Sequence, residues 1–329
     1  MAAPRKRPPP RIIVVAGGKG GVGKSTVTAN LGLAIGRLGH RVTMIDADLG
    51  AANLHTMLGI VHPTVGLAEF FDRKITLLDE ARLPVGMPTV ALVPGTSRPG
   101  AANLSAADKA RLLRAIARLD ADCVVIDVGA GTSFNVVDLV AVADIKLFVV
   151  TPQLPALHNA YALLKACVHR VVRKMSRDET EQAMIDSALG QENKARTIAQ
   201  LVDVLRPVNP EVCERIDDQL GRFGVGIVGN QVATAADTAV LGRMTSMIYD
   251  HLRVQAPVLA TVRRTPALAG GLKAGVGTVA ERGDDTHSAF RALAAKLLEM
   301  DLDRLRGVQR VSLEHTMPLW IQRELEAAT

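Results

Sequence analysis

Short runs of apolar, mostly β-branched residues recur along this chain and alternate with longer amphipathic stretches. The apolar runs lie at residues 12–16, 41–45, 89–93, 123–126, 146–150, 225–228 and 258–262. Continuous apolar runs of this length are typical of strands that are buried on both faces of a parallel sheet.

The stretches between the runs have the periodicity of amphipathic helices. Such helices are predicted to begin near residue 24 and to cover residues 49–58, 105–119, 156–175 and 288–300. Strands that alternate with helices in this way predict an α/β fold. We therefore expect a doubly wound, mostly parallel sheet with helices on both faces.

Residues 176–222 break this rhythm because they are charged, poor in β-branched runs and interrupted by two prolines. We interpret them as a helical insertion, with one or two extra helices over residues 178–205. The basic, proline-rich stretch 1–10 is predicted to be a disordered tail, and residues 301–329 form a C-terminal tail. Residues 11–300 are then a single domain that carries the insertion.

The amino-acid composition limits what the core can contain and says little about nucleic-acid binding. Hydrophobic residues make up 48% of the chain but aromatic residues only 3%, so the core must consist mainly of Ala, Val, Leu and Ile. The formal charge is +6, and half of it comes from the three basic residues at positions 5–7. The rest of the chain is only mildly basic, which by itself is weak support for nucleic-acid binding.

The cysteines exclude several metal sites. Cys123, Cys167 and Cys213 are far apart and form no C-x-x-C pair, so neither a zinc ribbon nor a bridged iron–sulfur site is indicated. Free buried thiols are typical of a reducing compartment. Residues 1–10 contain no apolar signal-peptide core, and no run of about 18 apolar residues is present. We therefore expect a cytoplasmic protein.

Residues 12–26 carry the strongest chemical signal. Gly18-x-x-x-x-Gly23-Lys24-Ser25 fits the P-loop pattern and stands between a predicted strand and a predicted helix. Glycines let backbone N–H groups converge on phosphate oxygens, and the helix adds the positive end of its dipole. Lys24 would reach the β- and γ-phosphates of ATP, and the Ser25 hydroxyl would hold Mg²⁺. The predicted binding residues in this loop are Gly18, Gly20, Gly21, Val22, Gly23, Lys24, Ser25 and Thr26.

Carboxylates follow two further strands. Asp46 and Asp48 come after one apolar run, and Asp127 comes after another in the position of a Walker B aspartate. The carboxyl ends of parallel strands meet at one edge of a sheet, so we expect these residues to join the P-loop and Thr151 in one site. Asp127 would hold Mg²⁺ in its outer shell. The alternative for Asp48 is a cap of the following helix.

Lys19 makes the loop more specific, because the general P-loop pattern does not require a second lysine. The run K-G-G-V-G-K-S resembles the deviant Walker A ATPases of the MinD/ParA family. In that family the early lysine reaches across a dimer interface to the partner's nucleotide. The resemblance therefore implies an ATP-dependent homodimer, in which Lys19 stabilises the transferring phosphoryl group in trans. The alternative is a solvated loop lysine.

The same resemblance implies further roles. Lys24 and Asp48 would join Lys19 as catalytic residues, with Asp48 orienting the hydrolytic water. The predicted metal site consists of Ser25, Asp46 and Asp127, with Asp46 acting through water. Asn230 stands where the family places an asparagine that recognises adenine, although an asparagine at a strand end is also an ordinary turn residue. Pro266 resembles the residue that packs on the base.

The resemblance covers residues 11–165 and 224–300. Residues 48–53 (D-L-G-A-A-N) and 127–131 (D-V-G-A-G) look closest to MinD-like and FlhG-like members. Val128 departs from the family, which often has a hydroxyl residue or a proline there. In the family, the loop after Asp46 is the first switch loop and the loop after Asp127 is the second. The change at Val128 concerns the contact of the second switch loop with the γ-phosphate and not metal binding.

The leading functional interpretation is an ATPase switch that positions or regulates a cellular machinery. ATP would drive dimerisation, the dimer would bind a surface or partner, and hydrolysis would release it. The alternatives are a ParA-like partition ATPase that binds non-specific DNA, and a P-loop ligase for small molecules, which Lys19 disfavours. An iron–sulfur reductase lacks its cysteine pair, and Asp48 and Asp127 disfavour a nucleotide switch without turnover.

The docking surface is the least determined part of this interpretation. Residues 318–325, with Trp320, form a short amphipathic stretch of the kind that lies in a membrane interface. Its polar face is acidic, whereas interfacial anchors favour Lys and Arg. We therefore expect a protein partner first, peripheral contact with the inner membrane second and DNA third.

Overall fold

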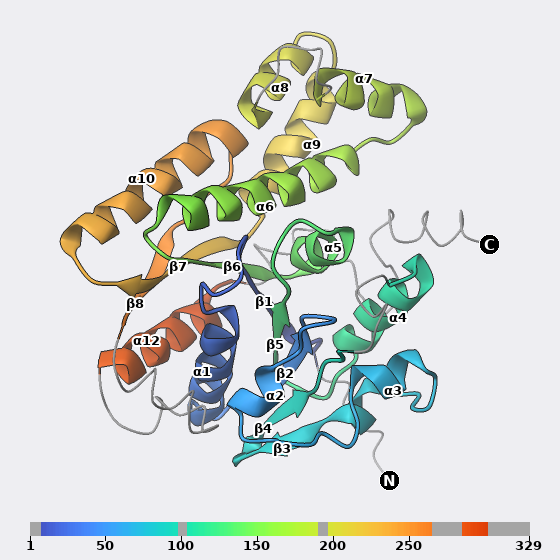
Figure 1. The fold of residues 1–329 in the computed structure, drawn as a ribbon. Helices are drawn as coiled ribbons and strands as arrows, with labels where there is room; N and C mark the ends of the chain where they lie inside the picture. Colours follow the sequence, from blue (N-terminus) through green and yellow to red (C-terminus); the bar gives the residue numbers. More distant parts are fainter. Residues whose placement is uncertain (1–7, 98–103, 190–196, 265–284, 302–329) are drawn as a thin grey trace.

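The computed structural model describes residues 8–97, 104–189, 197–264 and 285–301 of the chain. Most of the predicted N-terminal tail, Pro266, and Trp320 with nearly all of the predicted C-terminal tail lie outside the described residues. The described chain is built around one eight-stranded sheet with helices on both faces (Figure 1).

The sheet has the strand order β3-β4-β2-β5-β1-β6-β7-β8. Its parallel strands are β1 (Arg11–Ala16), β2 (Val42–Ala47), β4 (Met87–Val93), β5 (Cys123–Val128), β6 (Ile145–Val150), β7 (Val225–Val232) and β8 (Val258–Arg263). At one edge, β3 (Leu83–Val85) pairs antiparallel with β4. The doubly wound, mostly parallel sheet predicted from the apolar runs is confirmed.

Burial on both faces explains why the strand sequences show no polar alternation. In β1, Ile13 and Val15 face one apolar cluster, whereas Val14 and Ala16 face the other. The first cluster is covered by α1 (Lys24–Arg37) and α12 (Asp285–Glu299). The second is covered by α4 (Ala106–Ala117), α5 (Phe134–Val142), α6 (Leu154–Arg173) and α10 (Ala235–Leu252).

The stretch between α6 and β7 is helical. It contains α7 (Glu179–Leu189), α8 (Ile198–Leu205) and α9 (Pro210–Gly221), which lie beyond α6 on the outer side of the molecule (Figure 1). Pro210 occupies the first turn of α9, where its missing N–H is tolerated. The sequence predicted one or two helices over residues 178–205, and α9 was not predicted.

The predicted helix over residues 49–58 is wrong in its first half. Only α2 (Leu54–Met57) is helical, and the preceding residues form turns. Gly50 has a φ of 100°, in the left-handed region, which an α-helix cannot contain. The loop instead closes through a hydrogen bond from the Gly50 N–H to the Thr96 carbonyl, 2.8 Å away.

Further short elements were also missed, namely α3 (Leu67–Phe71), a 3₁₀ turn (Leu78–Ala81) and the edge strand β3. They form the margin of the sheet beside β4.

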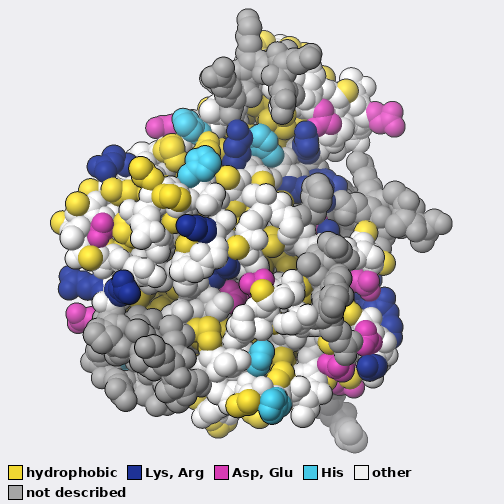
Figure 2. Space-filling view, in the orientation of Figure 1, with side chains coloured by type: hydrophobic (Ala, Val, Ile, Leu, Met, Phe, Trp, Pro, Cys, Tyr) yellow, Lys and Arg dark blue, Asp and Glu magenta, His cyan; other side chains and the backbone are white. Residues whose placement is uncertain are grey.

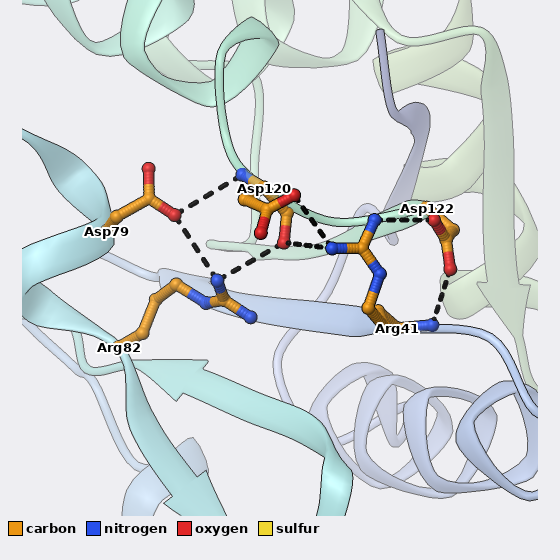
Figure 3. A network of polar contacts seen from close by, with 5 residues as sticks. All are labelled: Arg41, Asp79, Arg82, Asp120 and Asp122. Atoms are coloured by element: carbon orange, nitrogen blue, oxygen red, sulfur yellow. Dashed lines mark hydrogen bonds and ion pairs between the residues drawn. The ribbon is translucent and has the colours of Figure 1, made fainter. Parts of the chain in front are cut away.

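An ion-pair network joins the loops at the amino ends of β2 and β5 (Figure 3). The Arg41 guanidinium donates to the carboxylates of Asp120 and Asp122, each at 2.7 Å. Arg82 pairs with Asp79, and the same Asp79 carboxylate accepts from the Asp120 N–H. The network holds together the end of the sheet opposite the predicted site.

Candidate functional site

The P-loop lies between the end of β1 and the start of α1, as its sequence predicted. Gly23 precedes the first helical residue with a φ of 94°, a conformation that favours glycine. Among the described residues no side chain caps α1, and its first turn contains no acidic residue. The N–H groups and the positive dipole end of α1 are therefore available to an anion.

Close contact with α6 fixes the other side of this loop. A Cβ atom on Gly18 would lie 2.0 Å from the backbone of Asn159, so only glycine fits there. Gly20 and Gly21, by contrast, have nothing within 4 Å of such an atom. The loop is thus packed at its base and open at its tip. Lys19 is exposed at this tip and makes no hydrogen bond or ion pair with the described part of the chain.

At the base of the P-loop, Ser25 contacts Asp127, the predicted Walker B residue. Lys24 is buried, with 7% of its surface exposed, at the first position of α1. The Ser25 hydroxyl donates to the Asp127 carboxylate. Asp127 Oδ1 is buried and has no hydrogen-bond partner among the described residues. A buried carboxylate oxygen without a partner is costly, and a cation or its water shell would satisfy it.

Asp46 lies beside Asp127 because β2 and β5 are neighbours, and the two residues are paired in the register of the sheet. Burial raises the pKa of Asp46 to about 6, although the N–H groups of Leu54 and Asp48 favour its charged form. Burial also raises the pKa of Asp127 to about 7, and the charge of Asp46 adds to this rise. Buried carboxylates with raised pKa values gain from a bound cation.

Asp48 lies on the loop after β2, at the edge of this group. Asp46, and not Asp48, holds the start of α2, because its Oδ2 accepts from the Leu54 N–H at 2.9 Å. The loop after β5 approaches closely, since a Cβ atom on Gly129 would lie 2.8 Å from Asp48 Oδ1. The two predicted switch loops are therefore in contact in this structure.

Asn230, at the end of β7, reaches the same loop from the other side. It is buried, its Nδ2 donates to the Val22 carbonyl at 2.8 Å, and its Oδ1 accepts from the Gln231 N–H. Its amide thus contacts the P-loop backbone directly. This contact was not expected, and recognition of adenine by Asn230 stays a prediction.

The structure therefore brings together the described residues of the predicted site. An open anion-binding loop, a buried lysine, a hydroxyl and three carboxylates converge at the carboxyl edge of the sheet. These groups fit a nucleotide phosphate chain with Mg²⁺. Among the described residues no set of three or more His, Cys, Asp or Glu side chains is arranged to coordinate a metal directly. That the aspartates act through water stays a prediction.

Comparison with known proteins identifies the family. The family model of the CobQ/CobB/MinD/ParA nucleotide-binding domain matches residues 13–279. The chain belongs to this family. The match includes the P-loop, both predicted switch loops and the predicted helical insertion, and the resemblance inferred from the sequence is confirmed.

This member of the CobQ/CobB/MinD/ParA family is similar in sequence to two curated proteins with different names. The chain is 39% identical over 160 residues to the antiactivator FleN of Pseudomonas aeruginosa. This match covers 48% of the chain and 56% of the relative. It is also 37% identical over 155 residues to the septum site-determining protein MinD of Synechocystis sp., which covers 46% and 56%. The chain thus spans about half the length of the curated relatives it matches.

Solved structures with the same fold extend the likeness over most of the chain. The cell division ATPase MinD of Pyrococcus furiosus has a TM-score of 0.60 at 21% identity, covering 88% of this chain and 99% of that one. A chain of the MinC:MinD cell division protein complex of Aquifex aeolicus has a TM-score of 0.58 at 18% identity, covering 88% of this chain and 96% of that one. At these identities the likeness shows the fold. No helix in the described ranges of this family member is long and apolar enough to cross a membrane.

Proposed function

We propose that this chain is an ATP-dependent, dimerising ATPase that positions or regulates a cellular machinery. The observation that carries the proposal is the pair of lysines: Lys24 is buried at the start of α1, and Lys19 is exposed at the open tip of the same loop. Lys24 can serve only the phosphates bound by its own loop. Lys19 faces outward, where the nucleotide of a second copy would lie.

The remaining residues have distinct proposed roles. Ser25 and Asp127 would hold Mg²⁺, which supplies positive charge to the phosphates, and Asp46 would add a water-mediated contact. Asp48 would accept a hydrogen bond from the attacking water and orient it. Asp48 lies so close to Gly129 that a Cβ atom there would be 2.8 Å from Asp48 Oδ1, which supports a link between water orientation and the loop after β5.

The proposed docking partner is another protein, and peripheral membrane contact is second. The solved MinC:MinD complex supports the first choice, because it is a protein complex of a structural relative. Non-specific DNA, the docking surface of a ParA-like ATPase, is the third choice, because the net charge of +6 is modest. ATP-dependent sedimentation with liposomes and with non-specific DNA separates these partners. Undiminished liposome binding after deletion of residues 316–329 would remove a membrane role for the tail.

The proposal is tested by three variants. For each we would measure binding of an ATP analogue, the rate of hydrolysis, and the oligomeric state by size-exclusion chromatography with light scattering. Lys24→Ala should bind no ATP analogue. Lys19→Ala should bind it as a monomer. Asp48→Ala should bind it and dimerise, with hydrolysis slowed roughly 10²–10⁴-fold.

Lys74→Ala is the matched control, because Lys74 is an exposed loop lysine that pairs with Asp72 away from the site. It should behave as the unmodified protein. Wild-type affinity in Lys24→Ala, or a normal hydrolysing dimer of Lys19→Ala, would contradict the proposal.

A further inference from the structure

A cavity of about 410 Å³ lies outside the nucleotide site, between α5, α6 and α7. Its lining includes Thr132, Val137, His169, Arg170, Arg173 and Lys174. Gln182 of α7 closes the side that faces the insertion. The cavity therefore has walls from both the sheet domain and the insertion.

The lining is cationic. It contains three Lys and Arg side chains and no carboxylate among the lining residues that the structure describes. Figure 2 shows Lys and Arg side chains gathered over the part of the surface where α6 passes α5. Val137 and Ala166 supply an apolar floor beside the charges. Such a lining suits a carboxylate on an aliphatic stem better than a bare inorganic ion.

The cations are held in place by neighbouring elements. Arg170 donates to Asp138 of α5, whose carboxylate is fully buried and also accepts from Lys109. Arg173 pairs with Asp186 of α7 at 2.9 Å. Preorganised cations lose less conformational entropy when an anion binds.

His169 adds a polar group to the wall. Its Nε2 is buried and has no hydrogen-bond partner in the described chain. Burial, together with the charges of Lys165 and Arg173, lowers the pKa of His169 to about 4, so the ring is neutral at pH 7. A neutral imidazole nitrogen without a partner can form a hydrogen bond with a bound group.

The cavity is connected to the candidate catalytic site through one loop. Thr132 lies on the loop that leads from Asp127 into α5, and Val137 follows on α5 itself. A change in this loop on nucleotide exchange would move one wall of the cavity. The helix α6, which forms another wall through residues 166–173, packs against Gly18 nearer its start, at Asn159.

We propose that this cavity binds an acidic segment of a partner protein, and that the loop containing Thr132 makes this binding depend on the bound nucleotide. The partner is argued from the cationic lining with its apolar floor and from the half-enclosing insertion. A DNA duplex is too wide to enter a cavity of this size. The nucleotide dependence rests on the function proposed above, whereas the binding site itself does not.

The test measures fluorescence anisotropy of a labelled ten-residue oligoglutamate peptide with the full chain. Arg173→Gln combined with Lys174→Gln should weaken binding at least tenfold, as expected for two lost charge-assisted contacts. The control combines Arg243→Gln on α10 with Arg291→Gln on α12, both exposed, and changes the net charge equally. It should stay within twofold of the unmodified protein. Equal losses in both double variants would overturn the site.

Nucleotide and competitors complete the test. Affinity for the peptide should differ at least threefold between ADP and a non-hydrolysable ATP analogue, and equal affinities would overturn the coupling. Full displacement of the peptide by 10 mM inorganic phosphate, or by a short DNA duplex, would overturn the acidic-segment assignment.

Failure of the proposed ATPase function is seen separately, as loss of ATP-analogue binding in the unmodified protein. Peptide binding in that case would still support the cavity.

Discussion

Gly18 is the residue at which the P-loop is most tightly constrained. Gly18→Ala would place a methyl group 2.0 Å from the Asn159 backbone, and backbone cannot move aside cheaply. We expect a loss of about 2–3 kcal/mol in the free energy of unfolding. Urea denaturation followed by circular dichroism measures this loss.

Gly20→Ala is the matched control in the same loop. Gly20 does not have a positive φ, and nothing lies within 4 Å of an added Cβ atom. Its stability should change by less than about 0.5 kcal/mol. If both variants unfold at the same urea concentration, the contact with α6 does not constrain the loop.

The buried carboxylates of Asp46 and Asp127 predict that the free energy of unfolding depends on pH when no metal is bound. The pKa values of Asp46 and Asp127 are raised to about 6 and about 7, so the folded chain holds these protons more tightly than the unfolded chain does. Their stabilising contribution is present below pH 4 and is lost as pH rises through 7. Asp127→Asn removes one of these charges. In EDTA at pH 8 it should raise the free energy of unfolding by about 1–3 kcal/mol.

The gain should shrink at pH 5, where Asp127 is largely protonated in the folded state. Thermal unfolding at both pH values checks this difference. A variant that is less stable at pH 8 than the unmodified protein would show that Asp127 is compensated in another way.

At this scale the sequence identified most of the converging groups. Strand ends meet at one edge of a parallel sheet, so the sequence alone places Lys24, Asp46 and Asp127 together. The contact of Gly18 with Asn159 could not be predicted, because it depends on how α6 crosses the loop. The bond from Asn230 to Val22 also depends on the position of β7 beside β6.

At the scale of elements, a buried charge cluster connects three helices. Asp138 of α5 has no exposed surface, and it accepts from Lys109 of α4 and Arg170 of α6. Asp138→Asn keeps the shape of the side chain but leaves two cations without their charge partner. We expect a loss of about 3 kcal/mol in the free energy of unfolding, measured by urea denaturation.

Asp218→Asn serves as the control for this prediction. Asp218, on α9, is 61% exposed and pairs with Arg222, which directly follows the helix. Exposed pairs of this kind contribute little, so the loss should be at most about 0.5 kcal/mol. If both variants lose the same free energy of unfolding, the buried cluster around Asp138 stabilises the fold no more than an exposed ion pair does.

The sequence predicted the strands that are buried on both faces of the sheet. β1, β5 and β6 consist mainly of apolar residues because both faces of each strand are covered. The helix α5 was missed because its apolar residues follow the strand β5 after a short loop and lack a clear polar face. The helix α10 was missed because only four of its side chains are buried, which gives a weak periodic signal.

At the scale of the whole molecule, the sheet has two polar ends with different chemistry. The candidate site occupies the carboxyl end, and the Arg41 network of Figure 3 occupies the opposite end. Arg41→Ala should cost about 1 kcal/mol in the free energy of unfolding, because its carboxylate partners remain partly solvated. The cost should fall at 1 M salt. Affinity for an ATP analogue should stay within twofold, and a larger loss would show that the two ends are coupled.

The order of the strands has a consequence for synthesis. β1 lies at the centre of the sheet, where Arg11 pairs with Cys123 of β5 and Ile13 with Ile145 of β6. On the ribosome, β1 emerges long before either neighbouring strand has been made. Contacts so distant in sequence form slowly, because a long loop must close before they stabilise the chain. Nascent chains stalled before residue 123 should therefore be digested throughout by a protease, and protection of the P-loop should begin only after β6 has left the exit tunnel.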